Sequence, residues 1–135
     1  MNDKAIIRVS DIMKTNVDIV DGITTVSEAL DKMMHIENKS LIVDKRHDND
    51  EYGIVLLADI ARQVLAKDRA PERVNIYEVM SKPVITVQAN MDIRYCARLF
   101  DKFGLTRAPV VEKGKIVGMV SYTDMVLKGM AGRID

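Results

Sequence analysis

Apolar residues recur at helical spacing in two stretches of the chain. The first stretch begins at Thr25-Val26-Ser27-Glu28, a capping pattern in which the threonine oxygen and the glutamate satisfy free backbone N–H groups. Each stretch predicts an amphipathic helix with one buried face. The apolar positions expected on these faces are Val26, Ala29, Leu30, Met33 and Ile36 in the first helix, and Ile93, Ala97, Phe100 and Phe103 in the second.

Short apolar runs follow each predicted helix. Residues 41–43 and 53–57 are joined by a charged loop and are typical of a hairpin of buried strands. In the second half, residues 109–111 and 116–120 are joined through Lys113-Gly114, a tight-turn signal. A closing helix is expected after each hairpin. The order β-α-β-β-α, found twice, predicts an α/β protein with two small sheets, each covered by helices.

The two halves of the chain are copies of one pattern. Met13 and Met80 lie 67 positions apart (80 − 13), and the predicted strand and helix that follow keep this offset. The first hairpin strands align with a one-residue gap. The longer loop of the first hairpin then changes the offset of the strands that follow it. The second strands then match Gly53 with Gly118 and Asp59 with Asp124.

Each copy is small for an independent domain. The first repeat is predicted to span residues 8–66 and the second residues 76–130, with residues 67–75 as a polar linker. A unit of roughly 65 residues is only marginally stable by itself. The two repeats are therefore expected to pack as one module with pseudo-twofold symmetry, with clefts in symmetric pairs.

Composition narrows the class of protein. Apolar residues make up 47% of the chain and charged residues 30%, as in ordinary globular proteins. The longest apolar runs are too short to cross a membrane, and the first ten residues do not resemble a secretion signal. The single cysteine, Cys96, cannot form an internal disulfide, which fits a reducing compartment. We expect a cytoplasmic protein.

Charge and the polar residues argue against two other classes. Lys plus Arg and Asp plus Glu are both 20, so the basic excess of a dedicated nucleic-acid binder is absent. His35 and His47 have no partners at metal-ligand spacing, and no phosphate loop of the Gly-x-x-x-x-Gly-Lys type occurs. No nucleophile or acid–base constellation is visible, so we expect no enzyme activity and no metal.

The segment Gly118-Met119-Val120-Ser121-Tyr122-Thr123-Asp124 carries a family resemblance. A glycine, two apolar residues, Ser or Thr, two variable residues and Asp, within a doubled β-α-β-β-α order, resemble the CBS domain, named after cystathionine β-synthase. The resemblance covers roughly residues 8–130. It implies a paired module with two clefts that bind AMP, ADP, ATP or S-adenosylmethionine. In such clefts the aspartate hydrogen-bonds both ribose hydroxyls, and the Ser or Thr positions ribose or phosphate.

The resemblance assigns roles in a main cleft. Arg107 would grip phosphate oxygens in a bidentate way, and Met119 would flank the adenine. Thr24 would come from the other repeat, with Ala29 small enough to admit the base. A solvated arginine and a Ser-x-x-Asp capping box are the alternatives that need no ligand. The main-cleft residues are Thr24, Ala29, Arg107, Met119, Ser121 and Asp124.

A second cleft around Asp59 is expected to be weaker. Leu56 stands where the hydroxyl should be, and Met91 stands at the position of Thr24. Lys39, matched to Arg107, offers phosphate a charge without the fork geometry. Since Leu56 makes a capping box impossible, the presence of Asp59 favours a role of its own, although a charge preference at a helix start would also explain it.

The resemblance implies a stand-alone regulatory module that senses an adenosine nucleotide and acts on a partner. Such modules need no cofactor besides the ligand, and they commonly dimerise, so a homodimer is expected. One alternative is a dimerisation or interaction module whose clefts bind nothing. A CBS protein that binds nucleic acid is a further alternative, which the zero net charge disfavours.

Overall fold

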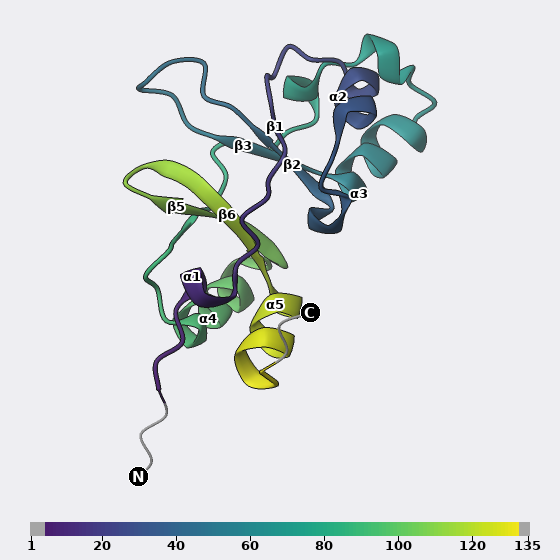
Figure 1. Cartoon of the computed structure of the whole chain (residues 1–135). Coiled ribbons are helices and arrows are strands. Elements are labelled where there is room, and N and C mark those ends of the chain that lie inside the picture. Colours follow the sequence, from purple (N-terminus) through teal and green to yellow (C-terminus); the bar gives the residue numbers. More distant parts are fainter. Residues whose placement is uncertain (1–4, 133–135) are drawn as a thin grey trace. The chain divides into compact units, whose positions relative to one another are not determined.

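The computed structural model describes residues 5–132 and divides into two compact units. One unit combines the N-terminal segment up to Asn16 with the chain from Ile85 onward, and we name it the Asp124 unit. The other runs from Val17 to Val84 and is named the Asp59 unit. Each unit contains one three-stranded sheet with its own helices, so the predicted α/β class with two small sheets is confirmed (Figure 1).

The Asp59 unit contains a sheet of order β1-β2-β3, in which β1 is parallel to β2 and β2 is antiparallel to β3. Short 3₁₀ turns and a π-helical segment complete the unit. Its strands are β1 (Ile19–Val20), β2 (Ser40–Val43) and β3 (Gly53–Leu56). Its helical elements are α2 (Val26–Lys32), η1 (Ile36–Asn38), α3 (Leu57–Ile60), η2 (Ala61–Leu65), η3 (Pro71–Arg73) and η4 (Ile76–Glu78).

The Asp124 unit repeats this topology with the order β4-β5-β6, again one parallel and one antiparallel pair. The last strand runs directly into the closing helix (Figure 1). The strands are β4 (Val87–Gln88), β5 (Arg107–Glu112) and β6 (Lys115–Ser121). The helical elements are α1 (Val9–Ile12), α4 (Ile93–Phe103), α5 (Tyr122–Asp124) and the π-helical η5 (Met125–Met130).

The predicted helix faces are partly right. Thr25 caps α2 as predicted, because its Oγ1 accepts a hydrogen bond from the Glu28 N–H at 3.1 Å. Three residues expected to be buried are not: Ile36 is 69%, Phe103 53% and Leu30 40% exposed. Ile36 is exposed because α2 ends at Lys32, so that Ile36 belongs to the separate turn η1. Helical spacing alone cannot show where the helix stops.

Each unit has its own apolar core, and each core includes a segment from the start of the other repeat. Val9 of α1 is fully buried with Cys96 and Phe100 in the Asp124 unit. Ile76 of η4 is fully buried with Leu41 in the Asp59 unit. Burying one large apolar side chain contributes about 1.5–3 kcal/mol, so these exchanged segments contribute substantially to each core.

The exchanged segments also extend the sheets. Lys14 and Met119 exchange two backbone hydrogen bonds of 2.9 and 2.8 Å, at the free edge of β6. Ser81 and Ile54 exchange two of 2.9 Å at the edge of β3. The same pairing therefore occurs in both units, as the sequence repeat predicts.

No helix within residues 5–132 combines the length and apolar character needed to cross a bilayer. In the same described range, no group of three or more His, Cys, Asp or Glu side chains could hold a metal ion. Cys96 is fully buried in α4, and burial raises the pKa of its thiol to about 11. A thiol with such a pKa stays protonated at neutral pH and is a poor nucleophile.

Candidate functional site

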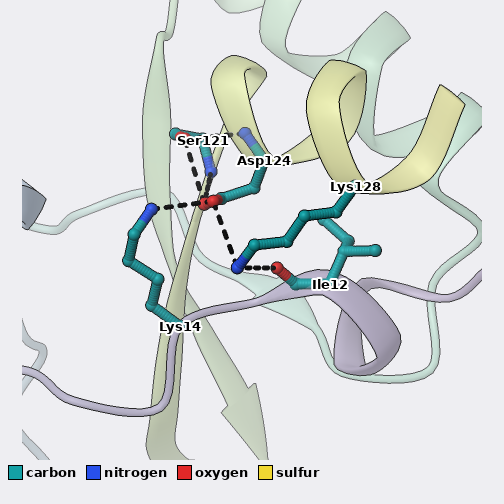
Figure 2. A network of polar contacts seen from close by, with 5 residues as sticks. All are labelled: Ile12, Lys14, Ser121, Asp124 and Lys128. Atoms are coloured by element: carbon teal, nitrogen blue, oxygen red, sulfur yellow. Dashed lines mark hydrogen bonds and ion pairs between the residues drawn. The ribbon is translucent and has the colours of Figure 1, made fainter. Parts of the chain in front are cut away.

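A capping box holds Asp124 at the point where β6 ends and α5 begins. The Ser121 Oγ accepts a hydrogen bond from the Asp124 N–H at 3.2 Å. In return, the Asp124 Oδ2 accepts from the Ser121 N–H at 3.2 Å and from its hydroxyl at 3.0 Å. The box expected as an alternative to ligand binding is therefore present. It fixes the carboxylate in one orientation, with Oδ2 turned toward the backbone (Figure 2).

Two lysines converge on the other carboxylate oxygen of Asp124 (Figure 2). The Lys14 Nζ donates to Oδ1 at 2.7 Å, and the Lys128 Nζ lies 3.6 Å from the same oxygen. Lys128 also donates to the Ile12 carbonyl at 3.3 Å. The Asp124 side chain is only 4% exposed, while Lys14 and Lys128 are 30% and 24% exposed. The carboxylate of this ion-pair network is therefore nearly buried, and its two lysines are half-buried.

Sequence reasoning missed both lysines. The pairing of Lys128 with Asp124 had a visible signal, because residues four apart lie on the same side of a helix. The position of Lys14 had none, since it depends on the backbone pairing of the N-terminal segment with β6.

The sheet places the other predicted residues beside this network. Arg107 lies opposite Ser121, and Pro109 lies opposite Met119, in the β5–β6 pair. Lys14 pairs with Met119 from the opposite side. Residues directly opposite each other, and residues two apart on a strand, share one face of a sheet. Arg107, Met119 and Ser121 therefore share one face with Lys14, next to Asp124.

We name this group the Asp124 corner: Lys14, Arg107, Met119, Ser121, Asp124 and Lys128. Four of its members were predicted for the main cleft, and the structure brings those four together within the Asp124 unit. Met119 is 3% exposed and Arg107 is half-buried. The corner combines a carboxylate, cationic groups and an apolar side chain.

Thr24 and Ala29, the other two predicted residues, lie in the Asp59 unit. Both line a cavity of about 220 Å³ beside β1 and α2, together with Asp18, Lys32 and Met33. Ala29 is fully buried and Thr24 is half-buried. The carboxylate of Asp18 accepts the N–H groups of the two residues that follow Met33, at 3.0 and 2.8 Å, and so holds the end of α2. The structure thus places Thr24 and Ala29 on one concave surface.

Asp59 has a local structural role, and the expectation that Leu56 makes any capping bond impossible is wrong. Its Oδ2 accepts the Leu56 N–H at 3.0 Å, so half of a capping box forms without a hydroxyl. Its Oδ1 accepts from the Arg62 guanidinium at 2.9 Å. The side chain of Asp59 is 15% exposed and that of Arg62 is 67% exposed. The presence of Asp59 beside Leu56 therefore needs no ligand to explain it.

Strand register corrects the alignment of the two repeats. Val43 lies opposite Gly53 and Val110 lies opposite Gly118, so the first hairpin strands match without the one-residue gap. Ser40, opposite Leu56, then takes the place of Arg107, opposite Ser121. Lys39 is exposed and corresponds to Thr106. Lys39 is therefore not the counterpart of Arg107, and its assignment to the second cleft stays a prediction.

Met91, the remaining residue of the second cleft, lies in the Asp124 unit. It is half-buried and packs against the core of that unit. Its carbonyl accepts the Val9 N–H at 2.8 Å, and its own N–H donates to the Gln88 carbonyl at 3.1 Å. Met91 therefore contributes to holding α1 in place, and its role in a cleft stays a prediction.

The sequence repeat coincides with a known family. A family model described as the CBS domain matches residues 9–66 and again residues 76–129. The chain belongs to the CBS domain family. The two matches follow the order of the repeats seen in the sequence, so this protein is a CBS pair.

Solved structures of CBS proteins share the fold. The hexameric CBS-CP12 protein from bloom-forming cyanobacteria is 35% identical, with a TM-score of 0.85, over 91% of this chain and 71% of that chain. The CBS domain pair of protein MJ0100 is 23% identical, with a TM-score of 0.78, over 96% of this chain and 100% of that one. These likenesses confirm the fold of the CBS pair.

Curated relatives of the CBS pair are longer. The uncharacterized protein MK0525 of Methanopyrus kandleri is 28% identical over 113 residues, which are 81% of this chain and 57% of that protein. The chain spans about half the length of the first curated relatives it matches.

Proposed function

We propose that this CBS pair is a regulatory module that binds an adenosine nucleotide at the Asp124 corner and acts on a partner protein. The observation that carries the proposal is the Asp124 corner. There Arg107 and the buried Met119 share one face of the β5–β6 pair, next to the Asp124 carboxylate that the capping box fixes. No catalytic step is proposed, because regulation through ligand binding requires only that two states of the module bind the ligand differently.

The chemistry of the corner matches an adenosine nucleotide. An ionised carboxylate accepts hydrogen bonds from both hydroxyls of a ribose. The planar guanidinium of Arg107 suits two phosphate oxygens, and the flexible thioether of Met119 suits the face of a purine. The CBS pair of MJ0100 was solved in complex with 5'-methylthioadenosine and S-adenosyl-L-methionine, which supports the adenosine class. Thr24 and Ala29 are proposed contacts of the base on the family resemblance alone.

Self-association is part of the proposal. The cyanobacterial CBS-CP12 protein is hexameric, and we propose a homodimer as the smallest assembly of this chain. Light scattering of the purified protein measures the mass directly, and a monomer at micromolar concentration would overturn this part. The single, buried cysteine fits a cytoplasmic location.

One observation favours a different function. Both oxygens of Asp124 already have donors from the protein itself. A carboxylate satisfied in this way is also expected in an interaction module whose clefts bind nothing. The two functions differ in whether nucleotide raises the stability of the protein.

A thermal-shift screen with AMP, ADP, ATP, S-adenosylmethionine and GTP separates them. A ligand at 100 times its Kd adds about 2.7 kcal/mol to the unfolding free energy, which raises the melting temperature by several degrees. We expect an adenosine compound to stabilise the wild type, GTP to fail, and Asp124→Asn to remove the shift. The matched control is Asp101→Asn on α4, which should keep it. If no adenosine compound stabilises the wild type, the proposed function is wrong.

A further inference from the structure

We propose that the Asp59 unit contains a separate ligand site, which takes a free α-amino acid with a large apolar side chain. The site is a cavity of about 490 Å³ beside the ends of β1 and β2. Ligand pockets in proteins typically measure roughly 300–1,000 Å³, so the cavity has room for a molecule of this class. Its lining residues all belong to the Asp59 unit, and none of them is a proposed nucleotide contact. The inference therefore goes beyond the proposed function and does not depend on it.

The cavity lies at the end of the sheet away from Asp59. Leu56, three residues before Asp59, pairs with Ser40 at the start of β2. The cavity is instead lined by Val43, at the other end of the same strand. It shares one lining residue, Asp21, with the smaller cavity beside α2. The site is thus distinct from the second cleft predicted around Asp59.

Four apolar side chains line the cavity. Val43 is buried and Met80 is half-buried, whereas Ile23 and Tyr77 are exposed. Gly22 leaves space between them, because a Cβ added there would lie 3.5 Å from both the Tyr77 Cβ and the Val43 Cγ1. An apolar or aromatic side chain that enters the cavity leaves water and contacts a ring and a thioether.

Two neighbouring carboxylates also line the cavity. Asp21 and Asp44 directly follow Val20 and Val43, which pair in register on adjacent parallel strands. Each carboxylate accepts one backbone N–H through Oδ1, at 3.0 Å for Asp21 and 2.8 Å for Asp44. Within residues 5–132, neither forms an ion pair with a cationic side chain. Since neighbouring like charges repel each other, an ammonium group bound between them is favoured.

Two cationic side chains line the same cavity and share one carboxylate. The Lys82 Nζ donates to the Asp50 Oδ2 at 2.8 Å, and the Arg46 Nε donates to the same oxygen at 3.0 Å. Asp50 balances only one of these two positive charges. Within the described part of the chain, the two terminal amino groups of Arg46 donate to no protein acceptor. They are available to a ligand carboxylate, which a guanidinium binds in a bidentate way.

This combination of groups defines the ligand class. A purely apolar ligand would cover charged groups without replacing their water. A ligand of one sign would meet like charges on part of the lining. An α-amino acid has an ammonium and a carboxylate on one carbon, so it complements both signs while its side chain fills the apolar part. Methionine, leucine and phenylalanine have side chains of suitable size and character.

Calorimetric titration of the full chain with L-methionine, L-leucine and L-phenylalanine tests the inference. At least one of the three should bind, and glycine, which lacks the apolar side chain, should not. Two analogues of the amino acid that binds test its charged groups. The amide lacks the carboxylate and the deaminated acid lacks the ammonium. Each analogue should bind at least about tenfold more weakly, the step that 1.4 kcal/mol of binding energy gives.

Two variants locate the binding site. In Gly22→Ala the added Cβ meets only ordinary van der Waals contacts, so the melting temperature should stay unchanged while the amino acid binds roughly tenfold more weakly. Asp44→Asn removes one carboxylate and should weaken binding to a similar extent. The matched control is Asp48→Asn, in the same hairpin loop and outside the lining of the cavity, which should bind as the wild type does.

Each outcome decides a different point. If none of the three amino acids binds, the inference is overturned, while the proposed nucleotide binding at the Asp124 corner stands. If an amino acid binds and no nucleotide stabilises the protein, the proposed function fails and the inference stands. If both variants keep the wild-type affinity, the cavity is not the site. If the amide binds as tightly as the amino acid, the ligand is the N-terminal residue of a peptide, and the proposed class is wrong.

Discussion

The two units solve the same structural problem with different side chains around one aspartate. Asp124 and Asp59 both follow the last strand of a sheet, and both accept the N–H of the residue three positions earlier. Beyond that bond they differ. Asp124 has a serine hydroxyl and two partly buried lysines, whereas Asp59 has one exposed arginine. The comparison teaches that a repeated backbone cap maintains an aspartate in both units, while the side chains around it differ, and nucleotide binding is proposed only where the serine hydroxyl and the two lysines are present.

The largest expected effect comes from removing each aspartate. Asp124→Ala should lower the unfolding free energy by about 3 kcal/mol, because it leaves two half-buried lysines without a partner and removes part of a cap. Asp59→Ala should cost about 1 kcal/mol, since its cap bond is similar and its arginine is exposed. Urea unfolding of both variants without ligand measures the difference. Equal losses would show that the lysine network contributes little.

A smaller effect separates the two edge pairings. A Cβ added to Gly118 would overlap the Lys14 carbonyl oxygen and lie 2.9 Å from the Met13 sulfur. At Gly53 the added Cβ would lie 3.0 Å from the Met80 sulfur and 3.2 Å from the Ser81 oxygen, which small shifts relieve. Gly118→Ala should therefore cost about 2 kcal/mol, and Gly53→Ala about 1 kcal/mol.

The glycine variants also test how Lys14 reaches the corner. Gly118→Ala should displace Lys14 and weaken the binding of the adenosine compound that stabilises the wild type, while Gly53→Ala should leave that binding unchanged. Urea unfolding and calorimetry on the same samples provide both readouts. A Gly118→Ala protein with unchanged stability and unchanged ligand affinity would show that the edge pairing does not position Lys14.

The sequence predicted the architecture well because the repeat and the apolar runs are local signals. Both hairpins, the Thr25 cap and the equivalence of Gly53 with Gly118 are found in the structure. The errors arise where neighbours in space set the outcome. The one-residue gap was wrong because strand pairing, and not similarity of letters, fixes register.

The candidate site likewise contains residues that the sequence could group and one that it could not. Arg107, Met119, Ser121 and Asp124 could be grouped from the sequence, because they lie on two strands joined by a tight turn. Lys14 could not, because it is more than a hundred residues from Asp124 and reaches it through backbone pairing to β6. Long-range pairings of this kind leave no periodicity in the sequence.

The smallest expected effect concerns the caps of the two main helices, which differ in charge. The strand and helix offset of 67 residues matches Thr25, the cap of α2, to Asp92, the cap of α4. Hydrogen bonds from the Arg94 side chain and backbone hold the pKa of Asp92 at about 2, below its ordinary value of 3.8. A carboxyl with a lowered pKa stabilises the fold above its ordinary pKa, and this stabilisation is lost as the pH falls toward the folded-state pKa.

Acid unfolding should therefore distinguish the caps. The urea midpoint of the wild type should fall between about pH 4 and pH 2, and Asp92→Thr should fall less over that range because its cap does not titrate. Some decline should persist, since Arg46 and Lys82 hold the pKa of Asp50 well below its usual range. Thr25→Asp, which places a carboxyl at the cap of α2, should make the urea midpoint fall further over the same pH range. If Asp92→Thr follows the wild-type curve, the α4 cap does not contribute to the acid sensitivity, and the two caps are equivalent in spite of their different charge.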